Sequence, residues 1–460
     1  MATRAGFDSG RIYPINLLRN RASTGMLIVS VLAAASMWFY VDRILVAHQL
    51  ADAAANQRPR GNLSDLYPRW LGARELLLHH RNPYSDDITR EIQKGYYGRA
   101  LDPTRPNDPR DQNGFAYPVY VVFLLSPLIA IPFPLLMVTF YWFLAVLTAA
   151  SVWFWLRALC WPLPLIDIAN CILFTIGSFS VVQGIKLQQL SLLVAALLAA
   201  SLAATVSGSL FAGGALLALA TIKPQLAWPS VAWLLMWAAS DWRARRKLVL
   251  SFALVMASLL AGAEAILPGW WRMFAGAVAR YSQYTESQSV IEVMLDQLWP
   301  VAGGIVGRLG GRVLAAAAVL ACTAVLWRLR REAADTPGFA SGTALVLALT
   351  VLVVPRYSPY NQILLLPAIL LLVRERAALP SQSRVRRLAY ALGSLMVGWQ
   401  WAASLCLTVA YLIGFRMLAL KGWQWPFYAT FALPVWVFAL VFFYAQSESR
   451  QSAQPPLPKN

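Results

Sequence analysis

The chain has 460 residues, of which 58% are hydrophobic and only 13% are charged, and 39 Lys and Arg against 21 Asp and Glu give a formal net charge of +18. A nucleic-acid-binding protein would carry this basic excess on a water-facing surface, interleaved with aromatic residues. Here the arginines stand in short clusters between apolar runs, which excludes that class and is typical of a polytopic membrane protein with basic loops facing anionic lipid.

Thirteen apolar runs follow one another along the chain. The first, from Gly25 to Ala47, exceeds the apolar core of a signal peptide and lacks a clear cleavage site, so we interpret it as an uncleaved span that follows a cytoplasmic N-terminus. The others occupy residues 116–131, 134–156, 163–182, 188–205, 207–222, 225–240, 247–268, 309–328, 339–355, 359–373, 388–415 and 425–445. A full span needs ~20 residues, so several runs are short enough to be tilted, broken or re-entrant, and we expect about 11 to 13 transmembrane helices.

This pattern predicts an all-α polytopic membrane protein. Residues 1–24 form a cytoplasmic N-terminal segment and residues 25–445 the transmembrane domain, with a first outer loop at 48–115. Residues 446–460 are polar and Pro-rich, and we expect a disordered cytoplasmic tail there.

The basic clusters set the orientation. "DWRARRK" (241–247), "RLRRE" (328–332) and "RVRR" (384–387) are expected on the cytoplasmic side. Counting spans away from them places most polar interhelical segments on the outer face, namely 48–115, 183–191, 222–225, 269–290, 356–362 and 421–425. Residues 115 and 183 are both expected on the outer side, which requires an even number of crossings between them, but three apolar runs lie in this stretch. The run 116–131 is a candidate for a partial or re-entrant helix, and the topology of residues 116–182 stays open.

The first outer loop concentrates ionisable chemistry, with nine of the 21 acids of the chain. Within "NLSDLYPRWLGARELLLHHRNPYSDD" (62–87), Ser64 is a candidate N-cap that would place Asp65 in the first turn of a helix. Apolar residues then recur at helical spacing, which predicts an amphipathic helix along the membrane surface. A second short helix is expected to begin at Ser85 and to end near Gly95 to Gly98.

Asp65 is the candidate catalytic carboxylate of this loop. A carboxylate at the N-terminus of a helix faces the positive end of the dipole, which favours its ionised form, and it can accept a proton from a hydroxyl nucleophile. The alternative is that it only stabilises its own helix. His48, His79 and His80 do not make a ligand set, and the four cysteines show no metal-binding spacing, so we expect no cofactor and no metal, although a divalent metal stays open.

Several segments resemble glycosyltransferase family 87 of the GT-C superfamily, whose characterised type is the polyprenyl-phosphate-mannose-dependent mannosyltransferase. "SDLYPRWLGARELLLHHRNPY" (64–84) resembles the first-loop signature of that family. Five further segments resemble its later motifs in the same order: "FAYPVYVVFLLSPLIAIPF" (115–133), "LQQLSLL" (187–193), "ALATIKPQ" (218–225), "ESQSVIEVMLDQL" (286–298) and "YSPYNQILLLPAILLL" (357–372). The chain departs from the pattern at Val119, where a proline is expected, at Gln188, where a glycine is expected, and at Ser287, where an asparagine is expected.

The resemblance implies a GT-C fold and an inverting glycosyltransferase. Such an enzyme transfers a sugar, mannose or another hexose, from a polyprenyl-phosphate donor to a lipid or glycan acceptor on the outer face of the membrane. It implies Asp65 as the general base on the acceptor hydroxyl. A phosphate leaving group is a weak base, so one carboxylate can suffice where glycosidases use two. The absence of a D-x-D pair from the sequence agrees with a lipid-monophosphate donor.

The remaining candidate residues would hold the donor and the sugar. Lys223 interrupts an apolar stretch, where a charge is costly unless it is functional or snorkels to the interface, and it is the first candidate for the donor phosphate. Arg356 and Arg69 are further phosphate-binding candidates. Candidates for the sugar or the acceptor are Gln189, Gln288, Ser289, Asn361 and Glu264, the last of which is alternatively a structural pair partner.

Two other functions fit a multi-pass membrane protein. A transporter or flippase of lipid-linked sugars would show inverted repeats with charged residues in both halves, whereas no repeat is seen and the polar segments gather on one face. A non-catalytic protein of envelope assembly is the other alternative. If the enzyme reading holds, Asp65, Lys223, Gln189 and Arg356 converge at the outer face of what we expect to be a bacterial inner or plasma membrane.

Overall fold

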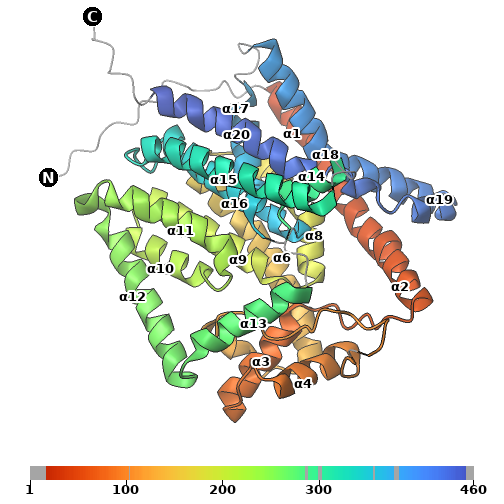
Figure 1. The fold of residues 1–460 in the computed structure, drawn as a ribbon. Helices are drawn as coiled ribbons and strands as arrows, with labels where there is room; N and C mark the ends of the chain where they lie inside the picture. Colours follow the sequence, from red (N-terminus) through yellow and green to blue (C-terminus); the bar gives the residue numbers. More distant parts are fainter. Residues whose placement is uncertain are drawn as a thin grey trace, which may run out of the picture.

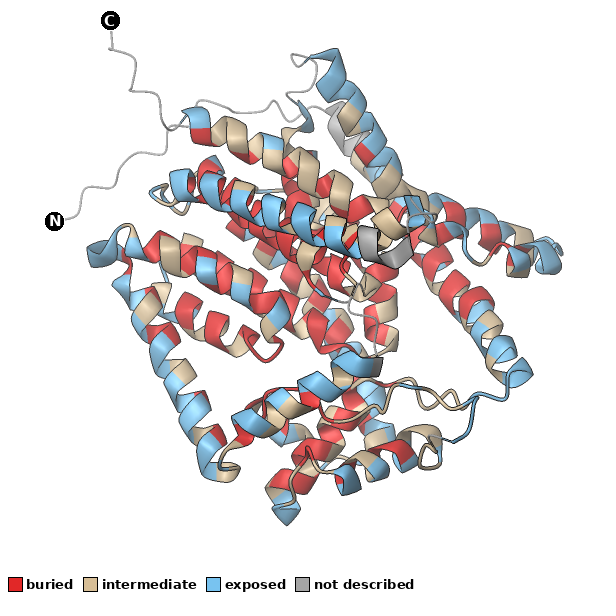
Figure 2. Cartoon of the chain, in the orientation of Figure 1, coloured by how far each residue is buried: buried red, intermediate tan, exposed pale blue. Residues whose placement is uncertain are grey.

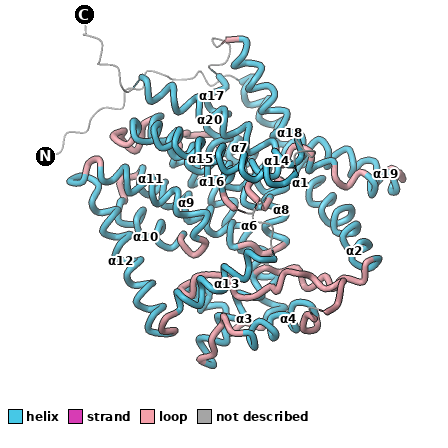
Figure 3. Tube along the Cα trace, in the orientation of Figure 1, coloured by secondary structure: helices cyan, strands magenta, loops and turns pink. Residues whose placement is uncertain are grey.

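The computed structural model describes residues 17–102, 104–284, 288–298, 303–355, 358–377 and 383–451. This part of the chain is helical and contains no strand (Figure 3). The helices are α1 (Leu17–Tyr40), α2 (Val46–Ala55), α3 (Leu66–His79), α4 (Asp86–Tyr97), α5 (Val121–Leu125), α6 (Phe133–Ala158), α7 (Leu165–Ile176), α8 (Phe179–Lys186), α9 (Leu190–Val206), α10 (Leu210–Ala220), α11 (Pro224–Ala239), α12 (Trp242–Ile266), α13 (Trp270–Tyr284), α14 (Val290–Leu298), α15 (Gly303–Leu329), α16 (Pro337–Val353), α17 (Leu366–Glu375), α18 (Arg384–Leu412), α19 (Arg416–Lys421) and α20 (Ala432–Gln451), with a 3-10 segment η4 (Pro359–Leu365) before α17.

Six helical segments of the described chain are long and apolar enough to cross a membrane, and they are Ser23–Ala55, Phe133–Ala158, Trp242–Ile266, Gly307–Leu329, Arg384–Leu412 and Arg416–Gln451. The pair α7 and α8, bent by 62°, makes a seventh if it is one span. The chain is therefore an all-α polytopic membrane protein. The sequence predicts about 11 to 13 spans, and the difference arises because other apolar runs form short helices, such as α9, α10 and α16, that lack the length of a full span.

The short apolar helices form the centre of the bundle. Helix α9 packs between α6 and α10, and nearly every residue of α16 is buried. Helices that are apolar on all sides lie in the interior, whereas α12, α15 and α18 present exposed leucines and valines around the outside (Figure 2). These outer apolar faces suit contact with lipid.

The excess run at 116–131 does not cross the bundle. Helix α5 has only five residues and continues into a 3-10 turn that packs on α3, where the indole Nε1 of Trp70 donates to the carbonyl of Leu128 at 3.2 Å. Helix α6 and the bent pair α7–α8 then lead from the first loop to residue 187. If the bent pair is one span, this stretch makes two crossings, which is the even number that a partial helix at 116–131 predicts.

The two ends of the bundle differ in charge. At one end the guanidinium of Arg245 donates to the carbonyls of Arg330, Arg331 and Glu332 at 3.1, 3.3 and 2.9 Å, which joins two of the basic clusters. Helix α11 ends there, since the carbonyl of Trp237 near its C-terminus accepts from the guanidinium of Arg245 at 2.8 Å. At the opposite end α3 and α4 of the first loop lie beside α13 (Figure 1), and the guanidinium of Arg280 donates to the carbonyl of Tyr84 at 3.3 Å.

The first loop folds into the two helices that its capping signals predict. The hydroxyl of Ser85 accepts a hydrogen bond from the N–H of Ile88 at 3.4 Å at the start of α4, and Gly98, with φ 81°, ends it. Helix α3 begins one residue later than predicted, with Asp65 rather than Ser64 at the N-cap. Much of α3 is enclosed by protein, since a Cβ at Gly72 would lie 2.4 Å from the ring of Phe115.

Candidate active site

Asp65 is held against the turn between α8 and α9. Its backbone N–H donates to the carbonyl of Leu187 at 2.9 Å, and its carboxylate accepts a hydrogen bond from the Nε2 of Gln189. The carboxylate makes no capping bond to the first N–H groups of α3, although Asp65 occupies the N-cap position. The preceding residue, Ser64, is also bonded to this turn, because its hydroxyl donates to the Oε1 of Gln188. The carboxylate is therefore directed toward α9.

Lys223 stands at the other side of Gln189. It is buried at the N-cap of α11, and its Nζ donates to the hydroxyl of Ser191 at 2.6 Å and to the Oε1 of Gln189 at 3.4 Å. The same ammonium lies 5.1 Å from the ring centre of Tyr360. Ser191 in turn donates to the Oδ1 of Asn361 at 2.9 Å. One chain of hydrogen bonds thus connects a carboxylate to an ammonium through the amide of Gln189.

Arg69 lies one turn beyond Asp65 on α3. Its Nη1 donates to the backbone carbonyl of Asp65 at 2.6 Å, and its guanidinium lies 4.6 Å from the ring centre of Tyr117. Its Nε is buried and has no hydrogen-bond partner among the described residues. This cation therefore retains one buried donor that the described protein does not satisfy.

Burial dominates the electrostatics of Asp65, which lies in the first loop, before α3. Desolvation raises the pKa of this carboxyl above its usual value, and neighbouring Asp111 raises it further, while the charges of Arg69 and Lys223 and the hydrogen bond from Gln189 lower the pKa only in part. The sequence predicts that the helix terminus favours the ionised form, and burial outweighs that effect. A carboxylate with a raised pKa is a stronger base when it is ionised.

Three helices begin at this site. Asp65, Gln189 and Lys223 are the N-cap residues of α3, α9 and α11, and none of them uses its side chain to cap its own helix. The N-terminal end of a helix carries a positive partial charge and exposed N–H groups, so it attracts anions such as phosphate. Together with Lys223 and Arg69, the three helix ends make this region favourable for a phosphate group.

The structure does not bring the other candidate residues into this network. Ser289 and Glu292 cap α14 reciprocally, with the Ser289 N–H donating to the Glu292 carboxylate at 2.6 Å and the Glu292 N–H donating to the Ser289 hydroxyl at 3.3 Å. Gln288 donates to the carboxylate of Asp296 at 2.6 Å. The carboxylate of Glu264 is exposed and accepts from the N–H of Gly269 at 2.8 Å. Arg356 lies outside the described residues.

The sequence analysis missed three residues of the site. Ser191 joins Lys223 to Asn361, while Tyr360 and Tyr117 face the two cations. All three lie inside segments that resemble family motifs: Ser191 in 187–193, Tyr117 directly before Pro118 in 115–133, and Tyr360 directly after Pro359 in 357–372. The available signal was a polar side chain repeated at short spacing within an otherwise apolar run, since such groups are buried only where they are satisfied.

The fold and this region define a multi-pass membrane protein with a buried carboxylate beside cations at one end of its helical bundle. The family model of glycosyltransferase family 87 matches residues 115–355, more than half of the chain. The chain belongs to glycosyltransferase family 87 and is a membrane glycosyltransferase. The matched stretch contains Gln189, Ser191 and Lys223, while Asp65 and Asn361 lie outside it. No curated protein and no solved structure matches the chain.

Proposed function

We propose that the protein transfers a sugar, mannose or another hexose, from a polyprenyl-phosphate donor to a hydroxyl of a lipid or glycan acceptor, with inversion at the anomeric carbon. The observation that carries the proposal is the hydrogen-bond chain from the Asp65 carboxylate through Gln189 to the Lys223 ammonium. It sets the proposed base and the proposed phosphate-binding cation on either side of one amide. A single displacement needs both groups, one at the acceptor hydroxyl and one at the departing phosphate.

In this mechanism Asp65 takes the proton of the acceptor hydroxyl. The acceptor oxygen forms a bond to the anomeric carbon, the bond from that carbon to the phosphate oxygen breaks, and the electron pair leaves with the polyprenyl phosphate. Lys223, Arg69 and the three helix N-termini stabilise the charge that grows on this phosphate. One displacement with attack opposite the leaving group inverts the anomeric centre.

The amides of the site would position the reacting groups. Gln189 donates to Asp65 and accepts from Lys223, so one side chain orients both the base and the cation. Asn361 receives its hydrogen bond from Ser191, which leaves its amide N–H groups for a sugar hydroxyl. These bonds fix the positions of the side chains relative to one another, which preorganises the site.

We assign the site to the outer face of a bacterial inner or plasma membrane. The site lies at the end of the bundle opposite the joined basic clusters, and such clusters remain on the cytoplasmic side. The single location of the polar network also favours an enzyme over a flippase, which needs polar groups along a path through the membrane.

Replacement of Asp65 tests the proposal. Asp65→Asn keeps the size of the side chain and removes the base, so we expect transfer from a radiolabelled polyprenyl-phosphate hexose to a membrane lipid extract to fall by about 10²–10⁴-fold. The matched control is Asp87→Asn, which changes an exposed acid of the same loop that pairs with Arg90 and should keep full activity. Unchanged transfer by a folded Asp65→Asn protein would show that another group accepts the proton.

A further inference from the structure

A continuous groove runs between the helices on the side of the bundle that carries the basic clusters. A cavity of about 540 Å³ lies between α1, α7, α17 and α18, and a second of about 490 Å³ extends between α17, α18 and α20. The two share Phe174, Ile369, Val373, Arg376, Val397 and Trp401, so they form one inter-helix groove. Each volume falls in the range of roughly 300–1,000 Å³ that is typical of small-molecule sites.

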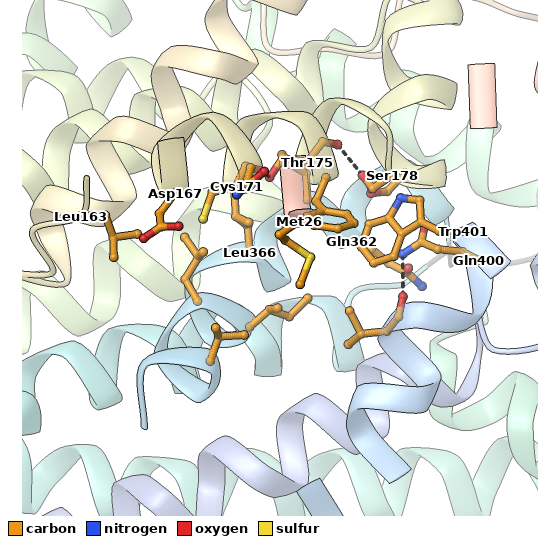
Figure 4. A pocket seen from close by; sticks show the side chains of 18 of the residues that line it. Met26, Leu163, Asp167, Cys171, Thr175, Ser178, Gln362, Leu366, Gln400 and Trp401 are labelled. Carbon is orange, nitrogen blue, oxygen red and sulfur yellow. Dashed lines mark hydrogen bonds between the residues drawn. The ribbon is translucent and has the colours of Figure 1, made fainter. Parts of the chain in front are cut away.

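The walls of this inter-helix groove are chemically apolar. Three polar side chains of its lining form hydrogen bonds with the protein backbone. Trp401 donates to the carbonyl of Gly177 at 2.7 Å, and Gln400 accepts from the N–H of Phe179 at 2.8 Å. Gln362 donates to the carbonyl of Thr430 at 2.6 Å. Figure 4 shows Trp401, Gln400 and Gln362 together at one end of the first cavity. Most of the surface that remains for a ligand is hydrocarbon and aromatic, which fits a hydrocarbon chain.

The bonds to Gly177 and Phe179 also have a structural origin. The backbone breaks between α7 and α8, where the chain bends by 62° and frees a carbonyl and an N–H in the interior of the bundle. Freed backbone groups must be satisfied within a membrane protein, and α18 supplies the indole and the amide that do so. Residues of α7 and of α18 line the first cavity, which lies beside this bend.

Positive charge lies at the mouth of the groove. Arg376 lines both cavities and Arg387 lines the second, and both are exposed. Neither arginine forms an ion pair within the part of the chain that the structure describes. Asp167 lines the first cavity, so the balance of charge along the groove is two cations to one anion. Guanidinium groups at a membrane surface bind phosphate oxygens in bidentate fashion and favour anionic lipids.

We propose that the inter-helix groove binds one anionic glycerophospholipid, with an acyl chain along the apolar walls and the phosphate at Arg376 and Arg387. This lipid site is separate from the site at Asp65, and it does not depend on the function proposed above. Gln362, at the inner end of the groove, is the chain neighbour of Asn361. A chain that fills the groove therefore packs against η4 and the α7–α8 bend and should stabilise both.

Lipid retention and thermal unfolding test this site. The full chain, delipidated in mild detergent, is mixed with phosphatidylglycerol or with phosphatidylcholine of the same acyl chains, and native mass spectrometry counts the bound lipid. We expect one phosphatidylglycerol to be retained and to raise the midpoint of thermal unfolding, with little effect of phosphatidylcholine. Equal retention of the two lipids would overturn the proposal, as would displacement of phosphatidylglycerol by polyprenyl phosphate, which would assign the groove to the donor.

Two variants separate the headgroup from the chain. Arg376→Ala with Arg387→Ala should weaken retention of phosphatidylglycerol by about thirtyfold, the effect of two arginines at an anionic surface. The matched control is Arg243→Ala with Arg246→Ala, which removes two exposed arginines of another basic cluster and should leave retention unchanged. An equal loss of phosphatidylglycerol retention in both double variants would show that general surface charge causes the effect, and it would overturn the proposed lipid site.

Gly398 offers a variant that fills the groove without disturbing the fold. It lines the second cavity in the middle of α18, and a Cβ built there meets no atom within 4 Å. Gly398→Leu improves helix propensity and occupies the space of the acyl chain. We expect loss of phosphatidylglycerol retention with an unfolding midpoint, measured without lipid, that is unchanged or higher. Full retention by this variant would show that no chain lies in the groove.

Discussion

At the scale of single residues, the state of Asp65 results from two opposing effects. Burial raises the pKa of the carboxyl, and Arg69, Lys223 and Gln189 reduce that rise without cancelling it. The native state therefore holds the proton more tightly than the unfolded chain does. The contribution of Asp65 to the free energy of unfolding is complete below its unfolded pKa and is lost as the pH rises through its native pKa. An ionised Asp65, as the proposed mechanism requires, therefore costs stability at neutral pH, and Asp65→Asn should fold there.

The raised pKa of Asp65 predicts the pH dependence of transfer. Because the base must be ionised, kcat/KM should rise with pH and level off only above the native pKa, higher than for an exposed aspartate. Lys223→Gln removes a charge that lowers this pKa, so the acid limb of the kcat/KM profile should move to higher pH. The rate of transfer should fall as well. A pH profile of kcat/KM measures both effects. An acid limb in the same place for both proteins would contradict the coupling between Lys223 and Asp65.

At the scale of elements, the turn between α8 and α9 positions Asp65, the proposed base. Gln188 has φ 53°, in the left-handed region that favours glycine, and glycine is the residue that the family resemblance leads one to expect there. Its side chain offsets the strain, because it accepts from the Ser64 hydroxyl and donates to the carbonyl of Met137 at 2.6 Å. The departure from the motif thus adds an attachment between the turn, the first loop and α6.

Substitutions at Gln188 separate strain from hydrogen bonding. Gln188→Ala loses both side-chain bonds and keeps the left-handed strain, whereas Gln188→Gly loses the bonds and relieves the strain, so the alanine variant should be less stable by about 1 kcal/mol. The neighbouring Leu187 has φ −85°, where the order should reverse, with Leu187→Ala more stable than Leu187→Gly. Unfolding in denaturing detergent measures the four variants. An alanine variant as stable as the glycine variant at position 188 would exclude strain there.

At the scale of the whole molecule, local signals predict local structure well and tertiary structure poorly. The starts and ends of α3 and α4 follow from capping residues such as Ser85 and Gly98, because those contacts span a few residues. From the sequence, the convergence of Asp65, Gln189 and Lys223 follows only from counting the membrane spans between polar segments and from the family resemblance. The bend between α7 and α8, the burial that raises the pKa of Asp65 and the role of Ser191 arise from packing between distant segments, which no local pattern contains.

The orientation of the whole bundle gives the last prediction. In a background without its four cysteines, Asp87→Cys places a thiol on exposed α4 beside the site, and Arg243→Cys places one in the basic cluster. Because arginine clusters stay on the cytoplasmic side, a membrane-impermeant maleimide added to intact cells should label position 87, and it should label position 243 only after permeabilisation. The reverse pattern would place Asp65 on the cytoplasmic face. The acceptor would then have to be a hydroxyl on that side, and the groove at Arg376 would open to the outer leaflet.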